Sequence, residues 1–309
     1  MSKQSTFSFD LSNYPILQQI GNTPLVKIDL FSDELPNVEI YAKAEMYNPG
    51  SSIKDRPVLR MLTEAIRSGE LTTDKIILDS TSGNAGIAYA MIGSVLGYRV
   101  ELVIPSNASE ERKKRIKAHG ANIIYTDALF GYDEALREVH RRCEASPEKY
   151  YMSDQYKNEY NWRAHYDTTG IEILEQIDGK LTHFVVGIGT GGTITGIGRR
   201  LKEYNAGIQV CAITPDDFPG IEGLKPLSKP GDIVPELLDE SVIDNRISVS
   251  IDQAYETCSR LAKRGWFVGQ SSGGYLRGAY ELAKQIQKGV IVTVFNDLGE
   301  RYFSTGLWD

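Results

Sequence analysis

The stretch KIILDSTSGNAGIAYAMIGSVLG, residues 75–97, contains a complete strand, loop and helix. Residues 75–80 form a short apolar run typical of a buried strand, and residues 84–97 have the small side chains of a closely packed helix. The same alternation continues on both sides of this stretch, which predicts an α/β fold with parallel sheets covered by helices on both faces. Further strands are expected at 38–45, 99–105, 121–127, 182–189, 208–215 and 289–297, and further helices at 56–69, 109–120, 132–146, 194–205, 252–265 and 273–286.

The composition is that of an ordinary globular protein. The chain has 309 residues, of which 41% are hydrophobic and 24% charged, with a net charge of -7. There is no long basic run, so nucleic acid is not expected as a partner. No apolar window of about 18 residues and no secretory signal are present, so neither a membrane span nor export is expected. The three cysteines and four histidines are scattered, which indicates no metal site and favours a reducing, cytoplasmic location.

One lysine lies in a loop of small and polar residues, NPGSSIKDR, residues 48–56. An arbitrary lysine in such a loop is usually exposed. A desolvated lysine, however, has a lowered pKa and can condense with an aldehyde. The small neighbours Gly50, Ser51 and Ser52 would allow a flat cofactor to lie close to Lys54.

Two further loops each follow a predicted strand and open a predicted helix. The loop TSGNAG, residues 81–86, combines hydroxyls, an amide and glycines in a way that suits a carboxylate at a helix start. The loop GIGTGGTITG, residues 187–196, suits a phosphate. It also satisfies the dinucleotide fingerprint GxGxxG, with Asp216 near the end of the next strand, so a nicotinamide-dependent oxidoreductase is an alternative.

Taken together, the three loops indicate one ligand pair. The ligand has a phosphate and an aldehyde, and beside it a partner with a carboxylate is bound. Pyridoxal phosphate (PLP) with an amino-acid substrate satisfies all three loops, whereas a dinucleotide leaves Lys54 and the 81–86 loop without a role.

The chain resembles the fold type II PLP enzymes, within the cysteine synthase and cystathionine β-synthase family. The resemblance is carried by GNTPL (21–25), NPGSSIKDR (48–56), TSGNAG (81–86), GTGGT (189–193) and GQSSGG (269–274), in the order that the family has them. It implies an α/β fold similar to the tryptophan synthase β subunit, with two three-layer αβα domains and mostly parallel sheets. Residues 1–45 plus 154–309 would form the large PLP-binding domain and residues 46–153 a small mobile domain. The resemblance also implies a homodimer.

The resemblance further implies a role for each residue of the site. Lys54 would form the internal aldimine with PLP and later remove the α-proton of the substrate. Asn84 would bind the ring hydroxyl, and Ser271 would contact the pyridine nitrogen, leaving it unprotonated and favouring β-elimination through an aminoacrylate over transamination. The phosphate would be held by Gly189, Thr190, Gly191, Gly192 and Thr193, and the substrate carboxylate by Thr81, Ser82, Asn84, Ala85 and Gln155.

Two departures from the family pattern bear on the reaction. Ala85 replaces the second threonine of the usual TSGNTG, which removes a hydroxyl donor. The loop after residues 221–223 is long and has Asp232 where the family's O-acetylserine-using enzymes tend to have glycine. Asp232 is either a solvated turn residue or a general base for a neutral nucleophile such as water, since an anionic hydrosulfide needs no base.

The predicted chemistry is β-replacement or β-elimination on a three-carbon amino acid, making or breaking the Cβ–S bond of cysteine. The leading prediction, based on Asp232, is conversion of cysteine and water, or another neutral nucleophile, to serine or an analogue and hydrogen sulfide. The alternatives are cysteine synthesis from O-acetylserine or O-phosphoserine, and thiol exchange as in cystathionine β-synthase. A phosphate leaving group would be bound by Lys225 and Lys229.

Overall fold

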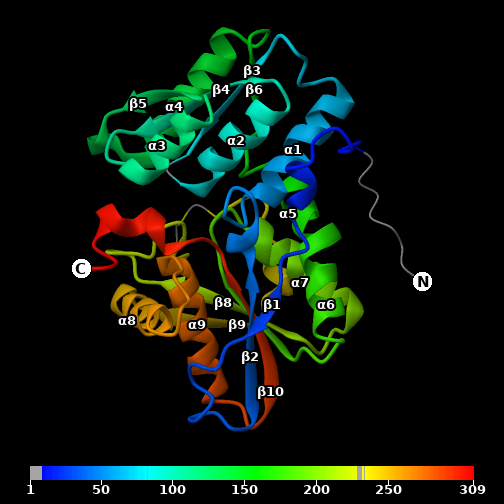
Figure 1. Ribbon diagram of the computed structural model, residues 1–309, viewed down its shortest axis with the longest axis vertical. Coiled ribbons are helices and arrows are strands. Elements are labelled where there is room, and N and C mark those ends of the chain that lie inside the picture. Colours follow the sequence, from blue (N-terminus) through cyan, green and yellow to red (C-terminus); the bar gives the residue numbers. More distant parts are fainter. Residues whose placement is uncertain (1–8, 82, 228–231, 233) are drawn as a thin grey trace.

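The computed structural model describes residues 9–81, 83–227, 232 and 234–309. It has two domains, each built on one sheet, which lie one above the other in Figure 1. The predicted α/β class with two domains and mostly parallel sheets is confirmed. The domain boundaries expected at residues 46 and 153 stay a prediction.

The large sheet has six strands in the order β1-β2-β10-β7-β8-β9. Every neighbouring pair is parallel except β1 and β2, which run antiparallel. Its central strands are buried along most of their length, as expected for a sheet covered on both faces. The strands are β1 (Leu25–Lys27), β2 (Val38–Ala44), β7 (His183–Gly187), β8 (Gln209–Pro215), β9 (Asn245–Val249) and β10 (Gly289–Phe295).

Helices cover both faces of this sheet. Figure 1 shows α8 and α9 on one side and α6 and α7 on the other, so the domain has three layers. The helices are α5 (Tyr160–Ala164), α6 (Gly170–Gln176), α7 (Gly192–Tyr204), α8 (Ile251–Ala262) and α9 (Gln270–Ala283), and a π-helical turn, His165–Thr169, joins α5 to α6.

The small sheet has four parallel strands in the order β5-β4-β3-β6. One apolar cluster joins this sheet to α1 and α2, and a second cluster joins its other face to α4. The elements are β3 (Ile76–Ser80), β4 (Arg99–Pro105), β5 (Asn122–Thr126), β6 (Tyr150–Met152), α1 (Asp55–Ser68), α2 (Asn84–Val95), α3 (Glu110–Ala118) and α4 (Gly131–Ala145).

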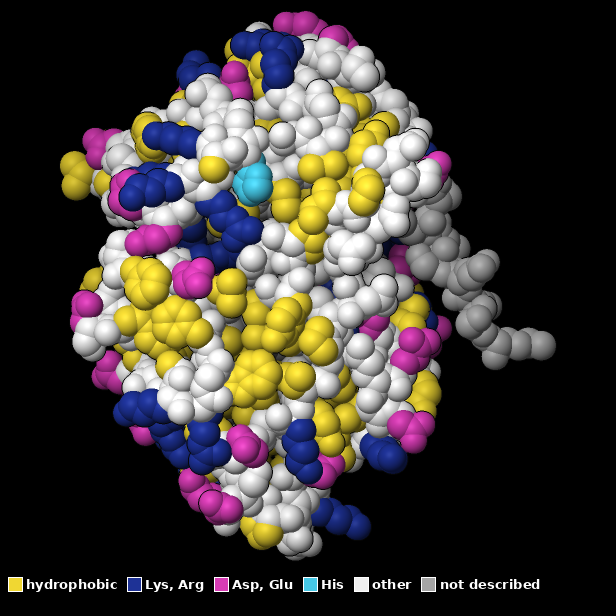
Figure 2. All heavy atoms as spheres, in the orientation of Figure 1, with side chains coloured by type: hydrophobic (Ala, Val, Ile, Leu, Met, Phe, Trp, Pro, Cys, Tyr) yellow, Lys and Arg dark blue, Asp and Glu magenta, His cyan; other side chains and the backbone are white. Residues whose placement is uncertain are grey.

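The C-terminal segment connects the two domains. After β10, a 3-10 helix, Gly299–Thr305, lies against α3 of the small domain (Figure 1). The Ser109 hydroxyl donates to the Arg301 carbonyl at 3.2 Å, and the Ser304 hydroxyl donates to Glu111 at 2.7 Å. This contact ties the C-terminal segment to the small domain, beside the hollow between the two domains that Figure 2 shows.

The predicted strands and helices are present, with ends that differ by up to about three residues. Sequence reasoning missed β1, β6, β9, α5 and α6, because these elements are short or carry polar residues that break the apolar pattern. In the described part of the chain, no helix combines the length and the apolar character that a membrane span needs.

Candidate active site

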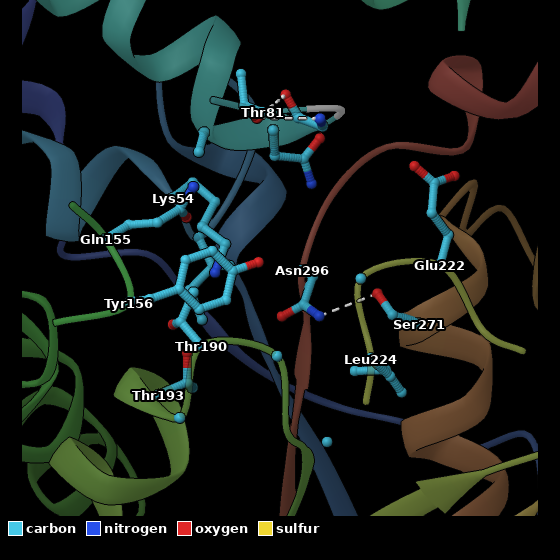
Figure 3. Close-up of a pocket in the computed structure, with 18 of the residues that line it drawn as sticks. Lys54, Thr81, Gln155, Tyr156, Thr190, Thr193, Glu222, Leu224, Ser271 and Asn296 are labelled. Carbon is cyan, nitrogen blue, oxygen red and sulfur yellow. Dashed lines mark hydrogen bonds between the residues drawn. The ribbon is translucent and has the colours of Figure 1, made fainter. Parts of the chain in front are cut away.

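A cavity lies between the two domains, at the carboxyl ends of several parallel strands. The loops after β3, β7, β8 and β10 all contribute to its wall, as expected for ligand sites in open α/β sheets. Figure 3 shows that the side chains of Lys54, Gln155 and Thr190 lie on one side, and Ser271 and Glu222 on the other. Of the predicted site residues, the lining includes Lys54, Thr81, Asn84, Ala85, Gln155, Gly189, Thr190, Gly191, Thr193 and Ser271.

Lys54 directly precedes α1 and projects into this cavity. Burial in the cavity lowers the pKa of its ammonium group from 10.5 to about 8. Within the described residues, its Nζ has no hydrogen-bond or ion-pair partner. A desolvated amine without a partner is unusual unless it serves a reaction, because the charged form then has no compensating contact.

The loop after β7 has no room for side chains at its glycines. A Cβ atom on Gly189 would lie 2.5 Å from the Gly223 carbonyl oxygen, and one on Gly192 would collide with Asn161. Gly191 has a φ of 86°, in the left-handed region that favours glycine. It precedes α7 without a side-chain cap. The Gly192 N–H donates to the Thr190 hydroxyl at 3.4 Å, and the next N–H groups of the first turn can serve an anion.

The two threonines of this loop are fixed by neighbouring side chains. Asn161 Nδ2 donates to Thr190 Oγ1 at 3.1 Å, and Thr193 Oγ1 lies 3.3 Å from His165 Nε2. Burial lowers the pKa of His165 well below its usual value, so this ring is neutral. The two threonine hydroxyls are therefore held in place by uncharged side chains. Gly192 begins α7 but is not among the described lining residues.

The loop after β3 is shaped by the hydroxyl of Thr81. Its Oγ1 accepts hydrogen bonds from the Gly83 and Gly86 amides at 3.1 and 3.2 Å. Gln155 lies beside this loop and its Nε2 donates to the Ser80 carbonyl at 3.5 Å. Ser82, which the sequence places in the carboxylate site, lies outside the described residues.

Residues after β10 complete the floor of the cavity, and sequence reasoning missed them. Asn296 donates from Nδ2 to Ser271 Oγ at 3.0 Å (Figure 3). Asp297 is fully buried and accepts hydrogen bonds from Asn84 Nδ2 at 2.7 Å and from the Tyr302 hydroxyl at 2.8 Å. The signal was the pair Asn296-Asp297 at the end of a strongly apolar strand, where a polar residue needs a reason.

The long loop after β8 contributes Glu222 to the described lining. Glu222 lines the cavity and pairs with Arg112 of α3, which lines it too. Asp232 is half-buried and is not among the described residues of the lining. Lys225 Nζ lies 5.6 Å from the centre of the Tyr156 ring, and Lys229 lies outside the described residues.

Comparison with known proteins identifies the class of enzyme. Residues 16–297 match the family model described as pyridoxal-phosphate dependent enzyme. The chain belongs to this family. It therefore uses PLP, and the family membership replaces the dinucleotide alternative.

Relatives and solved structures within this family point to cysteine chemistry. The chain is 51% identical to a cysteine synthase of Aquifex aeolicus over 301 residues, covering 95% of this chain and 91% of the relative. A hydrogen sulfide-producing enzyme from Fusobacterium nucleatum has a similar structure, with a TM-score of 0.85 and 34% identity over 93% of this chain and 99% of that one. A cysteine synthase from Entamoeba histolytica gives a TM-score of 0.89 and 32% identity, covering 100% and 93%. This chain is thus a PLP-dependent enzyme of the cysteine synthase family, acting on Cβ–S bonds.

The cavity fits the cofactor of the family. PLP needs an amine for its aldehyde and a cradle of N–H groups for its phosphate. The amine of Lys54, which has no hydrogen-bond or ion-pair partner among the described residues, lines the same cavity as the glycine loop at the start of α7. This loop leaves no room for a Cβ at Gly189.

Proposed function

We propose that this enzyme forms cysteine from an activated L-serine and sulfide. The observation that carries the proposal is the 51% identity to a cysteine synthase along nearly the whole of both chains. A water-using reaction would need a carboxylate that faces the substrate, and Asp232, the residue predicted for this role, is not among the described residues that line the cavity.

Lys54 has two roles in this proposal. Its amine would hold the cofactor through the aldehyde, and its Nζ would also be the acceptor of the substrate's α-proton. When bound, PLP withdraws electrons from the substrate Cα, which permits loss of that proton and of the group on Cβ. A pKa of about 8 leaves a useful fraction of the amine neutral near pH 7, where an ordinary lysine is almost fully charged.

The cofactor phosphate is proposed to bind at the start of α7. Gly189, Gly191 and Gly192 would bring backbone N–H groups close to it, and Thr190 and Thr193 would add hydroxyls. The described lining has no arginine or lysine in this loop, so the helix start and its amides supply the stabilisation.

Asn84 and Ser271 are proposed to hold the cofactor ring. Asp297 accepts from Asn84 Nδ2, which leaves the second N–H of that amide for the ring hydroxyl. The Ser271 oxygen accepts from Asn296, so the serine's own proton points away from Asn296. A serine that donates this proton suits a pyridine nitrogen without a proton, as expected for β-elimination chemistry.

The substrate carboxylate is proposed to bind at the start of α2. The helix begins at Asn84 after Gly83, which has no side-chain cap, and Gly83, Asn84 and Ala85 all line the cavity. The Gly86 N–H already donates to Thr81 Oγ1, so the N–H groups of Asn84 and Ala85 would serve the carboxylate. Thr81 and Gln155 lie on either side of this point, and Ala85 follows in the first turn. Ser82 is assigned to the same site from the sequence resemblance alone.

A second candidate function is release of sulfide from cysteine, with water giving serine. The observation that favours it is the similarity to a hydrogen sulfide-producing enzyme over 93% of this chain. This second function requires a base that takes a proton from water, and the sequence predicts Asp232 in that role.

The two functions are separated by assaying both directions with purified enzyme. We expect cysteine to form from O-acetyl-L-serine and sulfide with a kcat/KM at least about a hundredfold above that for consumption of cysteine alone. We expect Asp232→Asn to leave cysteine formation within about twofold, like the matched control Asp216→Asn, an exposed aspartate of the same loop. Faster release of sulfide and serine from cysteine, lost only in Asp232→Asn, would replace the proposal with the second candidate.

We also propose that the enzyme is a homodimer, as the sequence resemblance implies, and cytoplasmic, as its scattered cysteines indicate. Light scattering after size-exclusion chromatography is expected to give about twice the chain mass of 34.4 kDa. A monomer mass would contradict the dimer.

A further inference from the structure

The mouth of the cavity contains an ion pair that joins the two domains. Arg112 comes from α3 of the small domain and Glu222 from the loop after β8 of the large domain. The Arg112 side chain is 4% exposed, and its guanidinium lies 4.9 Å from the centre of the Tyr302 ring. Gln270 Nε2 also donates to Glu222 at 3.3 Å. Figure 3 shows Glu222 on the same side of the cavity as Ser271, opposite Lys54.

This pair determines the net charge that a substrate side chain meets. Among the described lining residues, Lys54, Arg112 and Glu222 are those with ionisable charged side chains. While Lys54 holds the cofactor covalently, as it would when a serine ester enters the cavity, it contributes no ammonium group, and the charges of Arg112 and Glu222 cancel. A doubly negative phosphate on the serine side chain would therefore be desolvated without a net positive charge to compensate it.

We infer that Glu222, through its pairing with Arg112, makes the enzyme select an activated serine whose leaving group is neutral, such as an acetyl ester, over a phosphate ester. This inference rests on the proposed β-replacement of an activated serine. The pair acts by charge: Glu222 neutralises the buried cation that would otherwise attract an anionic leaving group.

Lys225 is the competing source of positive charge in the same loop. Its Nζ lies over the Tyr156 ring, and Lys225 itself is not among the described lining residues. Phosphate recognition by Lys225 would make the wild-type enzyme active on O-phosphoserine, and Lys225→Ala would abolish that activity.

The test compares O-acetyl-L-serine with O-phospho-L-serine, each with sulfide, as a ratio of kcat/KM values. The wild type is expected to favour the acetyl ester by about a hundredfold. Glu222→Gln, which leaves a net positive charge at the mouth, is expected to raise the value for O-phosphoserine and so narrow the ratio by about tenfold or more. Glu110→Gln removes an exposed carboxylate of the same helix as Arg112 and is expected to leave the ratio unchanged. Adding Arg112→Gln to Glu222→Gln is expected to restore the wild-type ratio.

Half-saturating concentrations of both esters are measured as well, from the change that each causes in the absorbance of the bound cofactor. This absorbance change reports the selectivity between the two esters without turnover. It also verifies that each variant is folded and contains PLP. If neither ester gives cysteine, the proposed function fails, and the binding ratio still decides the inference. A wild type that uses or binds both esters equally, or a ratio that Glu222→Gln leaves unchanged, would overturn it.

Discussion

Two neighbouring loops of the large sheet, after β7 and after β8, line the same cavity in different ways. The loop after β7, residues 188–191, is short and leads directly into α7, with glycines where a Cβ would meet other atoms. In the described part of the loop after β8, no helix or strand occurs before residue 240, and Glu222 pairs with an arginine 110 residues away. In the proposed function, the backbone of the first loop binds the cofactor phosphate, which every turnover requires. The second loop presents side chains to the cavity, and these side chains can differ between enzymes that use different substrates.

The largest effect is expected when the cofactor side of the cavity loses its amine. Lys54→Ala should lower turnover at least about a thousandfold, because both the covalent link and the α-proton acceptor are removed. The purified variant should also lack the wild-type cofactor absorbance near about 410 nm, a value typical of a PLP Schiff base. Lys114→Ala, an exposed lysine on α3, is the control and should keep both.

A smaller but still large effect is expected from a single methyl group in the loop after β7. In Gly189→Ala, the new Cβ would lie 2.5 Å from the Gly223 carbonyl oxygen, so the backbone must shift. We expect PLP affinity, measured by reconstitution of the cofactor-free enzyme, to fall about tenfold to a hundredfold, with about 1–3 kcal/mol lost in stability. An unchanged PLP affinity would show that the phosphate is bound elsewhere. The loop after β7 would then not differ from the loop after β8 in the way described above.

An effect of about tenfold is expected from pH on cofactor uptake. Only the neutral amine attacks the aldehyde, and burial lowers the pKa of Lys54 to about 8, so the neutral fraction rises through this pH and is complete above it. The rate of PLP uptake by the cofactor-free enzyme should therefore rise from pH 7 to about 9 and then level off. A rate that continues to rise towards pH 10.5 would indicate an ordinary, solvated lysine.

The smallest effect is expected at the start of α2, where this chain departs from the family pattern. Ala85→Thr restores a hydroxyl beside the proposed carboxylate site and should lower KM for the amino acid by about threefold at most, with kcat little changed. The gain is limited because Ala85 is buried and the larger side chain must be accommodated. An increase in KM would mean that packing outweighs the new hydrogen bond.

The parts of the site that depend on backbone geometry were predictable from the sequence. Glycines and threonines at fixed spacing after a strand have few other uses, so the loops at 81–86 and 187–196 could be read directly, and ten of the predicted residues line one cavity. Asp297 and Glu222 could not be found in this way, because a carboxylate becomes informative only through its partners. Asn84 lies 213 residues from Asp297, and no local pattern records that contact.

The most direct measurement gives the enzyme both candidate substrates in one tube. O-acetyl-L-serine labelled with carbon-13 at Cβ, unlabelled cysteine and sulfide are mixed in oxygen-18 water, and the products are identified by mass spectrometry at early times. The proposed function predicts labelled cysteine, with the unlabelled cysteine remaining intact. Serine that contains oxygen-18, formed from the unlabelled cysteine while the labelled ester is not used, would contradict it.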